Sequence, residues 1–166
     1  MEAAEMAYKR GHNVILFEKE NRLGGNLILA AAKPFKGDTK RYLDFLVRNT
    51  SKLPIDLRLS TEATIDKVKE EKPDVLIVAI GAEPYIPDLP GTDRINAILA
   101  SDLLDNKADI AGDKVIVAGG GLVGCEVALT LAMAGKKVTI VEMTDEVAKD
   151  AYFVPRIALL GLLDRE

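Results

Sequence analysis

The chain has 166 residues, of which 48% are hydrophobic and 29% charged, and its formal net charge at neutral pH is -4. This composition is typical of a globular protein with a buried core, and the well-mixed charges exclude the basic surface of a nucleic-acid binder. No apolar run approaches the ~20 residues of a membrane-spanning helix, so we expect no membrane partner, and the single cysteine favours a cytoplasmic location.

The chain begins with a predicted helix and a predicted strand. Residues 1–10 contain strong helix formers with charges between them, and Gly11 then ends the helix. No capping residue precedes this helix, so it reads as if a turn before it were absent. Residues 13–18 form a short apolar run that ends in Glu18 and predicts a buried strand.

A turn and several short elements complete the first half of the chain. Residues 19–25 form a turn that contains two glycines, where the backbone can come close to a ligand. The patterns after the turn predict a helix over 37–48, short strands over 55–59 and 62–64, and a charged helix over 65–72. The apolar stripe of the first of these helices indicates that it packs in the core.

A continuous apolar run over residues 74–80 predicts a central strand of a parallel sheet. It is followed by the small residues Gly81 and Ala82, which would lie at the carboxyl end of the strand, where open α/β sheets bind ligands. A proline-rich stretch opens residues 85–110, which we interpret as a linker; an ordinary surface loop is the alternative.

The most informative motif lies in the second half. A predicted strand over residues 115–118 runs into a Gly-x-Gly-x-x-Gly turn, which opens a helix rich in alanine and leucine. A second strand ends in Glu142, close to the separation of about 20 residues expected between such a turn and its acidic partner. A turn that binds nothing is the alternative, but the flanking elements favour a dinucleotide site. Its residues are Gly119, Gly120, Gly121, Leu122, Val123, Gly124 and Glu142.

The members of this motif have distinct physical roles in holding a dinucleotide. Gly119 permits the tight turn, Gly121 lets a pyrophosphate approach the backbone, and Gly124 lets the helix pack closely on the sheet. The N–H groups and partial positive charge at the helix start attract the pyrophosphate. Glu142 is expected to accept hydrogen bonds from the adenosine ribose and to repel a 2′-phosphate, so we predict NAD(H) in preference to NADP(H).

An internal repeat relates the two halves. When residues 2–18 are laid over residues 126–142, both copies read as a helix, a glycine turn and a strand ending in glutamate. The second copy is preceded by a strand and a glycine turn that the first copy lacks. We therefore predict an α/β fold of two incomplete Rossmann-like dinucleotide-binding modules, with parallel sheets flanked by helices. Residues 1–84 would form the truncated first module, 85–110 the linker, and 111–166 the N-terminal part of the second.

The sequence resembles flavoproteins that pair an FAD-binding with an NAD(P)H-binding domain. Ile80-Gly-Ala-Glu-Pro84 is similar to the turn that precedes the NAD domain in these proteins. Three further segments narrow the resemblance to the C-terminal region of the 2,4-dienoyl-CoA reductase / 2-enoate reductase family of NADH:flavin oxidoreductases. They are Leu23-Gly-Gly-Asn-Leu27, Lys33-Pro-Phe-Lys36 and Gly120-Gly-Leu-Val-Gly-Cys-Glu126.

The resemblance implies two cofactors, NAD(H) on the glycine turn and FAD on the first module. The residues implied for FAD are Glu18, Lys19, Gly24, Gly25, Asn26, Gly81 and Ala82. Because the first module lacks a glycine turn for the pyrophosphate, we expect this chain alone not to hold FAD. The family further implies a relay from NADH through FAD and an iron–sulfur cluster to FMN in a barrel, where a carbon–carbon double bond is reduced.

The leading hypothesis is therefore an NADH-binding electron-input segment, whose partner is the remaining FMN/iron–sulfur barrel portion of a flavoenzyme. No acid–base residue is predicted, because hydride transfer between cofactors requires positioning. A non-catalytic nucleotide-binding or assembly module, with unpaired strand edges joined in a homodimer, is the alternative. A disulfide reductase or NADH oxidase-type flavoprotein would need redox cysteines, whereas Cys125 is expected to be a core residue. With one cysteine and one histidine, we expect no metal site.

Overall fold

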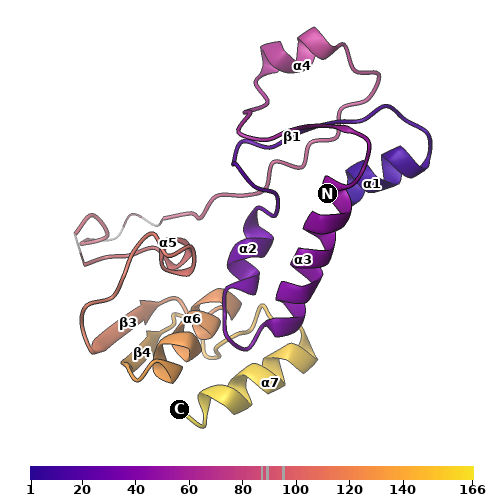
Figure 1. Cartoon of the computed structure of the whole chain (residues 1–166). Helices are drawn as coiled ribbons and strands as arrows, with labels where there is room; N and C mark the ends of the chain where they lie inside the picture. Colours follow the sequence, from indigo (N-terminus) through magenta and orange to yellow (C-terminus); the bar gives the residue numbers. More distant parts are fainter. Residues whose placement is uncertain (87, 89, 95) are drawn as a thin grey trace. The chain divides into compact units, whose positions relative to one another are not determined.

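The computed structural model describes residues 1–86, 88, 90–94 and 96–166 of the chain (Figure 1). The chain divides into two compact units. The first comprises residues 1–31 and 36–83, and the second comprises residues 32–35 and 84–166. Each unit contains a two-stranded parallel sheet together with helices, which confirms the predicted α/β fold class. In the described ranges, no helix is long and apolar enough to cross a membrane.

The elements of both units are named here in chain order. In the first unit they are α1 (Glu2–Lys9), β1 (Ile15–Phe17), α2 (Asn26–Ala31), α3 (Gly37–Ser51), β2 (Asp56–Arg58) and α4 (Ile65–Glu71). In the second unit they are α5 (Ala100–Leu104), β3 (Lys114–Ala118), α6 (Leu122–Met133), β4 (Lys137–Val141) and α7 (Phe153–Leu163). Of these, α2 and α5 were not predicted from the sequence.

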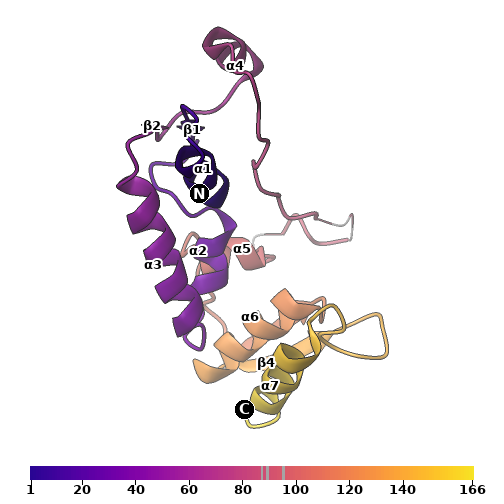
Figure 2. The ribbon, with the colours of Figure 1, turned by 90° about the vertical axis from the view of Figure 1, so that its right-hand side faces the viewer.

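The first unit combines a small sheet with helices that pack on one another. Strands β1 and β2 pair in parallel, and α2 and α3 lie side by side (Figure 2). Helix α1 packs against α3, where the Tyr42 hydroxyl donates a hydrogen bond of 3.0 Å to Glu2. The predicted apolar stripe of α3 is only partly buried, because Leu46 is in the core whereas Tyr42 and Phe45 are nearly half exposed.

The predicted central strand over residues 74–80 is wrong. This segment has no regular structure, and its apolar side chains face solvent, with Val75 77% and Ile80 86% exposed. A strand needs hydrogen bonds to a neighbouring backbone, and in the described part of the first unit the only strand pair is β1 with β2. Apolar composition alone does not supply that partner.

The short strand predicted over residues 62–64 is also wrong. Thr64 instead caps α4, with its side chain accepting a hydrogen bond from the N–H of Lys67. A threonine before a charged helix satisfies one of the N–H groups that the helix leaves open, and this local interaction prevails over the strand preference of the segment.

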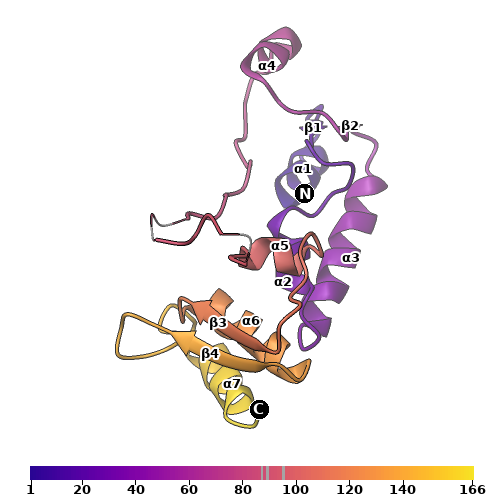
Figure 3. The ribbon, with the colours of Figure 1, turned by 90° about the vertical axis from the view of Figure 1, so that its left-hand side faces the viewer.

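The second unit has the predicted succession of strand, glycine turn, helix and strand. Strands β3 and β4 pair in parallel, with α6 packed against both (Figure 3). Helix α6 is apolar on nearly all sides and is correspondingly buried, and α7 packs against it. The core of the unit contains Cys125, Leu129, Ala148 and Leu159. Burial of a side chain such as Leu129 contributes about 2 kcal/mol to the stability of the folded unit. This burial holds α6 in place behind the glycine turn.

Candidate dinucleotide-binding site

The turn between β3 and α6 requires glycine at two positions, for two different reasons. Gly119 has a φ of +104°, which residues with a side chain rarely adopt. At Gly124 the limit is space, because a Cβ there would lie 1.9 Å from the backbone oxygen of Gly119. The first glycine thus reverses the chain, and the second brings the start of α6 against the end of β3.

Glu142 lies directly after β4 and hydrogen-bonds to the turn. Its carboxylate accepts one bond of 2.6 Å from the N–H of Gly120 and another of 2.9 Å from the N–H of Thr144. These bonds lower the pKa of the Glu142 carboxyl below its usual value, and the bond from Thr144 contributes more than the bond from Gly120. The structure therefore brings a carboxylate that is charged at neutral pH to the glycine turn, while its contact with a ribose stays a prediction.

Asp150 is a residue of this region that the sequence analysis missed. Its carboxylate accepts a hydrogen bond of 2.7 Å from the N–H of Leu122, the first residue of α6. Gly121, the N-cap of α6, has no side chain with which to accept from the helix, so an acceptor must come from elsewhere. A glycine at the N-cap position indicates in the sequence that another residue must accept this hydrogen bond, but it does not indicate which residue.

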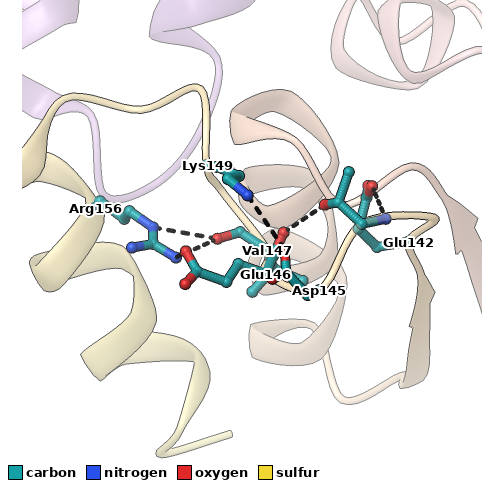
Figure 4. A network of polar contacts seen from close by, with 7 residues as sticks. Glu142, Asp145, Glu146, Val147, Lys149 and Arg156 are labelled. Carbon is teal, nitrogen blue, oxygen red and sulfur yellow. Dashed lines mark hydrogen bonds and ion pairs between the residues drawn. The ribbon is translucent and has the colours of Figure 1, made fainter.

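The loop that follows β4 is held at two places, by the glycine turn and by α7. The N–H of Ala148 donates a hydrogen bond of 2.6 Å to the oxygen of Gly120, and Ala148 is fully buried. Arg156, on α7, donates to the oxygen of Val147 at 3.1 and 3.2 Å and forms an ion pair of 2.8 Å with Glu146 (Figure 4). The loop therefore connects the glycine turn with α7.

Cys125 is a structural residue. It is fully buried, and its thiol donates a hydrogen bond of 3.1 Å to the oxygen of Gly120. Burial raises the pKa of the thiol, whereas a nucleophilic cysteine requires an accessible thiolate. This environment is the one expected for a core residue.

A buried ion pair in the second unit was also missed. Lys33 Nζ lies 3.0 Å from a carboxylate oxygen of Glu126, and the two side chains are only 3% and 7% exposed. In the internal repeat, Glu126 corresponds to Glu2, which accepts a hydrogen bond from the Tyr42 hydroxyl. Each glutamate therefore connects its helix to a neighbouring segment of the chain. The signal in the sequence is a charged residue inside an apolar helix, which must find a partner when it is buried.

Some of the residues predicted for FAD meet in the first unit. Asn26 Nδ2 donates a hydrogen bond of 3.1 Å to the oxygen of Ala82, although the two residues are far apart in the sequence. Gly81 has a φ of +80°, and a Cβ there would lie 3.9 Å from the same Asn26 nitrogen. The turn after residue 80 and the start of α2 therefore lie side by side, as a shared ligand would require.

The other residues predicted for FAD lie within the loop between β1 and α2. Glu18 accepts a hydrogen bond of 2.9 Å from the N–H of Glu20, which repeats the geometry of Glu142 with Thr144. Gly24 and Gly25 have φ values of +133° and +49°. Lys19 is exposed. The equivalence of the two glutamates, inferred from the repeat, therefore extends to their local hydrogen bonding, while contacts with FAD stay a prediction.

Comparison with known proteins identifies the family. The family model described as pyridine nucleotide-disulphide oxidoreductase matches residues 1–158. An NADH oxidase of Thermoanaerobacter brockii is 40% identical over 96% of this chain and 25% of its own length. A bilirubin reductase of Mediterraneibacter gnavus is 42% identical over 90% of this chain and 23% of its own length. The chain thus spans about a quarter of the length of these curated relatives.

A solved structure supports the same assignment. The complex of 2-naphthoyl-CoA reductase with 2-naphthoyl-CoA matches with a TM-score of 0.90 and 33% identity, over 99% of this chain and 25% of that one. The predicted Rossmann-like fold and the resemblance to the enoate reductase family are confirmed by these matches. The chain belongs to the pyridine nucleotide-disulphide oxidoreductase family.

Proposed function

We propose that this chain is the electron-input part of a flavoenzyme, which binds NADH on the glycine turn of the second unit and passes its hydride to FAD. The observation that carries the proposal is the meeting of the turn, the start of α6 and Glu142 at one edge of the sheet. Because β3 and β4 are parallel, the turn and Glu142 both follow carboxyl ends of strands, where such sheets bind ligands.

The residues of the chain would act by binding and orientation. The N–H of Leu122 and the partial positive charge at the start of α6 attract the pyrophosphate, and Glu142 fixes the adenosine ribose. In the first unit, the contact between Asn26 and Ala82 supports a place for FAD beside the turn at Gly81. The two cofactors supply the hydride chemistry, so no residue is proposed as an acid or base.

The later fate of the electrons is a proposal that rests on the relatives. One relative is named bilirubin reductase, and the matched structure is a 2-naphthoyl-CoA reductase with its CoA ester. We infer that the complete enzyme reduces an activated carbon–carbon double bond of an enoate or enoyl-CoA, in a barrel portion with FMN and an iron–sulfur cluster.

An assembly module without catalysis is the second candidate. It is favoured by the exposed apolar residues 75–80, which have no strand partner in the described part of the first unit. An exposed apolar segment of this kind can pair with another chain and so form a homodimer. Binding of NADH with the predicted preference for its unphosphorylated ribose would favour the electron-input function over this candidate.

Replacement of Gly121 by valine is expected to abolish NADH binding, because the added side chain fills the space through which the pyrophosphate reaches the backbone. Calorimetric titration of both proteins with NADH measures this effect. The variant should fold, since the three atoms nearest to a Cβ at this position all belong to the exposed Asp150 carboxylate, 3.3–3.5 Å away, which can shift. Circular dichroism checks the fold, and retained affinity would show that the pyrophosphate binds elsewhere.

A further inference from the structure

A carboxylate already lies at the place proposed for the pyrophosphate. Asp150 accepts the hydrogen bond of the Leu122 N–H at 2.7 Å. Its two oxygens would lie 3.3 and 3.4 Å from a Cβ on Gly121, so the carboxylate occupies the space that this glycine leaves open. Carboxylates and phosphates are both attracted by the N–H groups and partial positive charge of a helix N-terminus.

We propose that Asp150 is an internal competitor of the dinucleotide. Its carboxylate satisfies the start of α6 while no ligand is bound, and it leaves when a pyrophosphate takes the same N–H groups. This inference rests on the proposed function, because it concerns the same site. It adds a residue that sets the affinity for the dinucleotide without touching its ribose or its nicotinamide.

Repulsion between negative charges requires that the Asp150 carboxylate leave when a pyrophosphate binds. The site already contains the carboxylate of Glu142, which is bonded to the N–H of Gly120. A pyrophosphate carries two negative charges, and it cannot share one helix N-terminus with Asp150 without strong repulsion between like charges. Binding of the dinucleotide therefore needs Asp150 to turn outward.

The local structure permits this movement. Asp150 is exposed, so its carboxylate can be solvated once it leaves the helix. The preceding residues are fixed, because Ala148 is buried and bonded to Gly120 and Val147 is held by Arg156. The loop can thus keep its anchors while the exposed end of the turn moves.

The cost of this displacement lowers the apparent affinity for NADH. A protein whose binding-competent state is only partly populated binds its ligand more weakly by that fraction. For a side chain that caps a helix with typical strength, the expected loss is about fivefold. Replacement of Asp150 should therefore raise the affinity for NADH about fivefold.

The test is calorimetric titration of the full chain with NADH for the wild type, Asp150→Ala and Asp150→Asn. We expect the Kd of Asp150→Ala to be about fivefold lower than that of the wild type. The gain should be smaller for Asp150→Asn, because the amide oxygen still accepts from the helix while the charge is lost. Without ligand, Asp150→Ala should melt about 2–4 °C lower, since α6 loses its cap.

The matched control is Asp145→Ala. Asp145 lies in the same loop and loses the same charge, but its side chain is 81% exposed and pairs with Lys149 at the surface (Figure 4). Its Kd for NADH should stay within about twofold of the wild type. If NADH binds the wild type and Asp150→Ala equally, or the variant more weakly, the inference is wrong and the proposed function stands. If NADH binds none of these proteins, the proposed function falls and the inference with it.

Discussion

Replacement of Lys33 by methionine is expected to destabilise the second unit by about 3–5 kcal/mol, because it leaves the buried carboxylate of Glu126 without its ammonium partner. The aliphatic part of the side chain is kept, so the effect arises from the charge and not from a cavity. Denaturant unfolding of the full chain, followed by circular dichroism, measures the change in the free energy of unfolding. Such a loss is a large fraction of the stability of an ordinary domain.

Two further variants separate the ion pair from other effects of the substitution. Lys149→Met breaks the surface pair with Asp145 and should cost at most about 1 kcal/mol, since both partners are exposed. The double variant Lys33→Met/Glu126→Leu should recover most of the lost stability, because two apolar side chains replace both buried charges. A change below about 1 kcal/mol for Lys33→Met alone would contradict the buried pair.

Replacement of Gly124 by alanine is expected to destabilise the second unit by about 3 kcal/mol or more. The added Cβ would lie 1.9 Å from the oxygen of Gly119 and 3.5 Å from Val117, so α6 must move away from the end of β3. That movement disturbs the packing of the buried helix and separates the N–H groups proposed to bind the pyrophosphate. Denaturant unfolding and NADH titration of the variant measure the two effects.

Gly161→Ala is the matched control for this substitution. Gly161 lies within α7, and a Cβ there would meet no atom within 4 Å. Alanine is favoured over glycine inside a helix by roughly 0.5–1 kcal/mol, so this variant should be slightly more stable than the wild type. The same chemical change is thus expected to have opposite signs at the two positions. Equal effects would contradict the close approach at Gly124.

The internal repeat and the glycine turn predicted much of the fold because both depend on local chemistry. Strand β3, helix α6 and strand β4 follow one another within a short stretch, and the contacts that join them recur in every unit of this kind. The position of Glu142 beside Gly120 followed from the same spacing. The repeat also anticipated that Glu18 and Glu142 are equivalent, and each bonds the N–H two residues further on.

The features that were missed depend on partners distant in the sequence. Residues 74–80 have the composition of a central strand, but strand formation is decided by a neighbouring backbone, and the segment is exposed. The cap of α6 comes from Asp150, beyond β4, and the partner of Glu126 comes from Lys33, outside the repeat. No local pattern in one sequence indicates which distant side chain will satisfy a buried or helix-terminal group.

Calorimetric titration of the full chain with NADH and, separately, with NADPH is the most direct test of the proposed site. We predict that NADH binds, and that NADPH binds about tenfold or more weakly, because the negatively charged Glu142 repels a 2′-phosphate. Loss of this preference in Glu142→Gln would attribute it to the carboxylate. Equal affinity for the two dinucleotides would contradict the role of Glu142, and binding of neither would contradict the site.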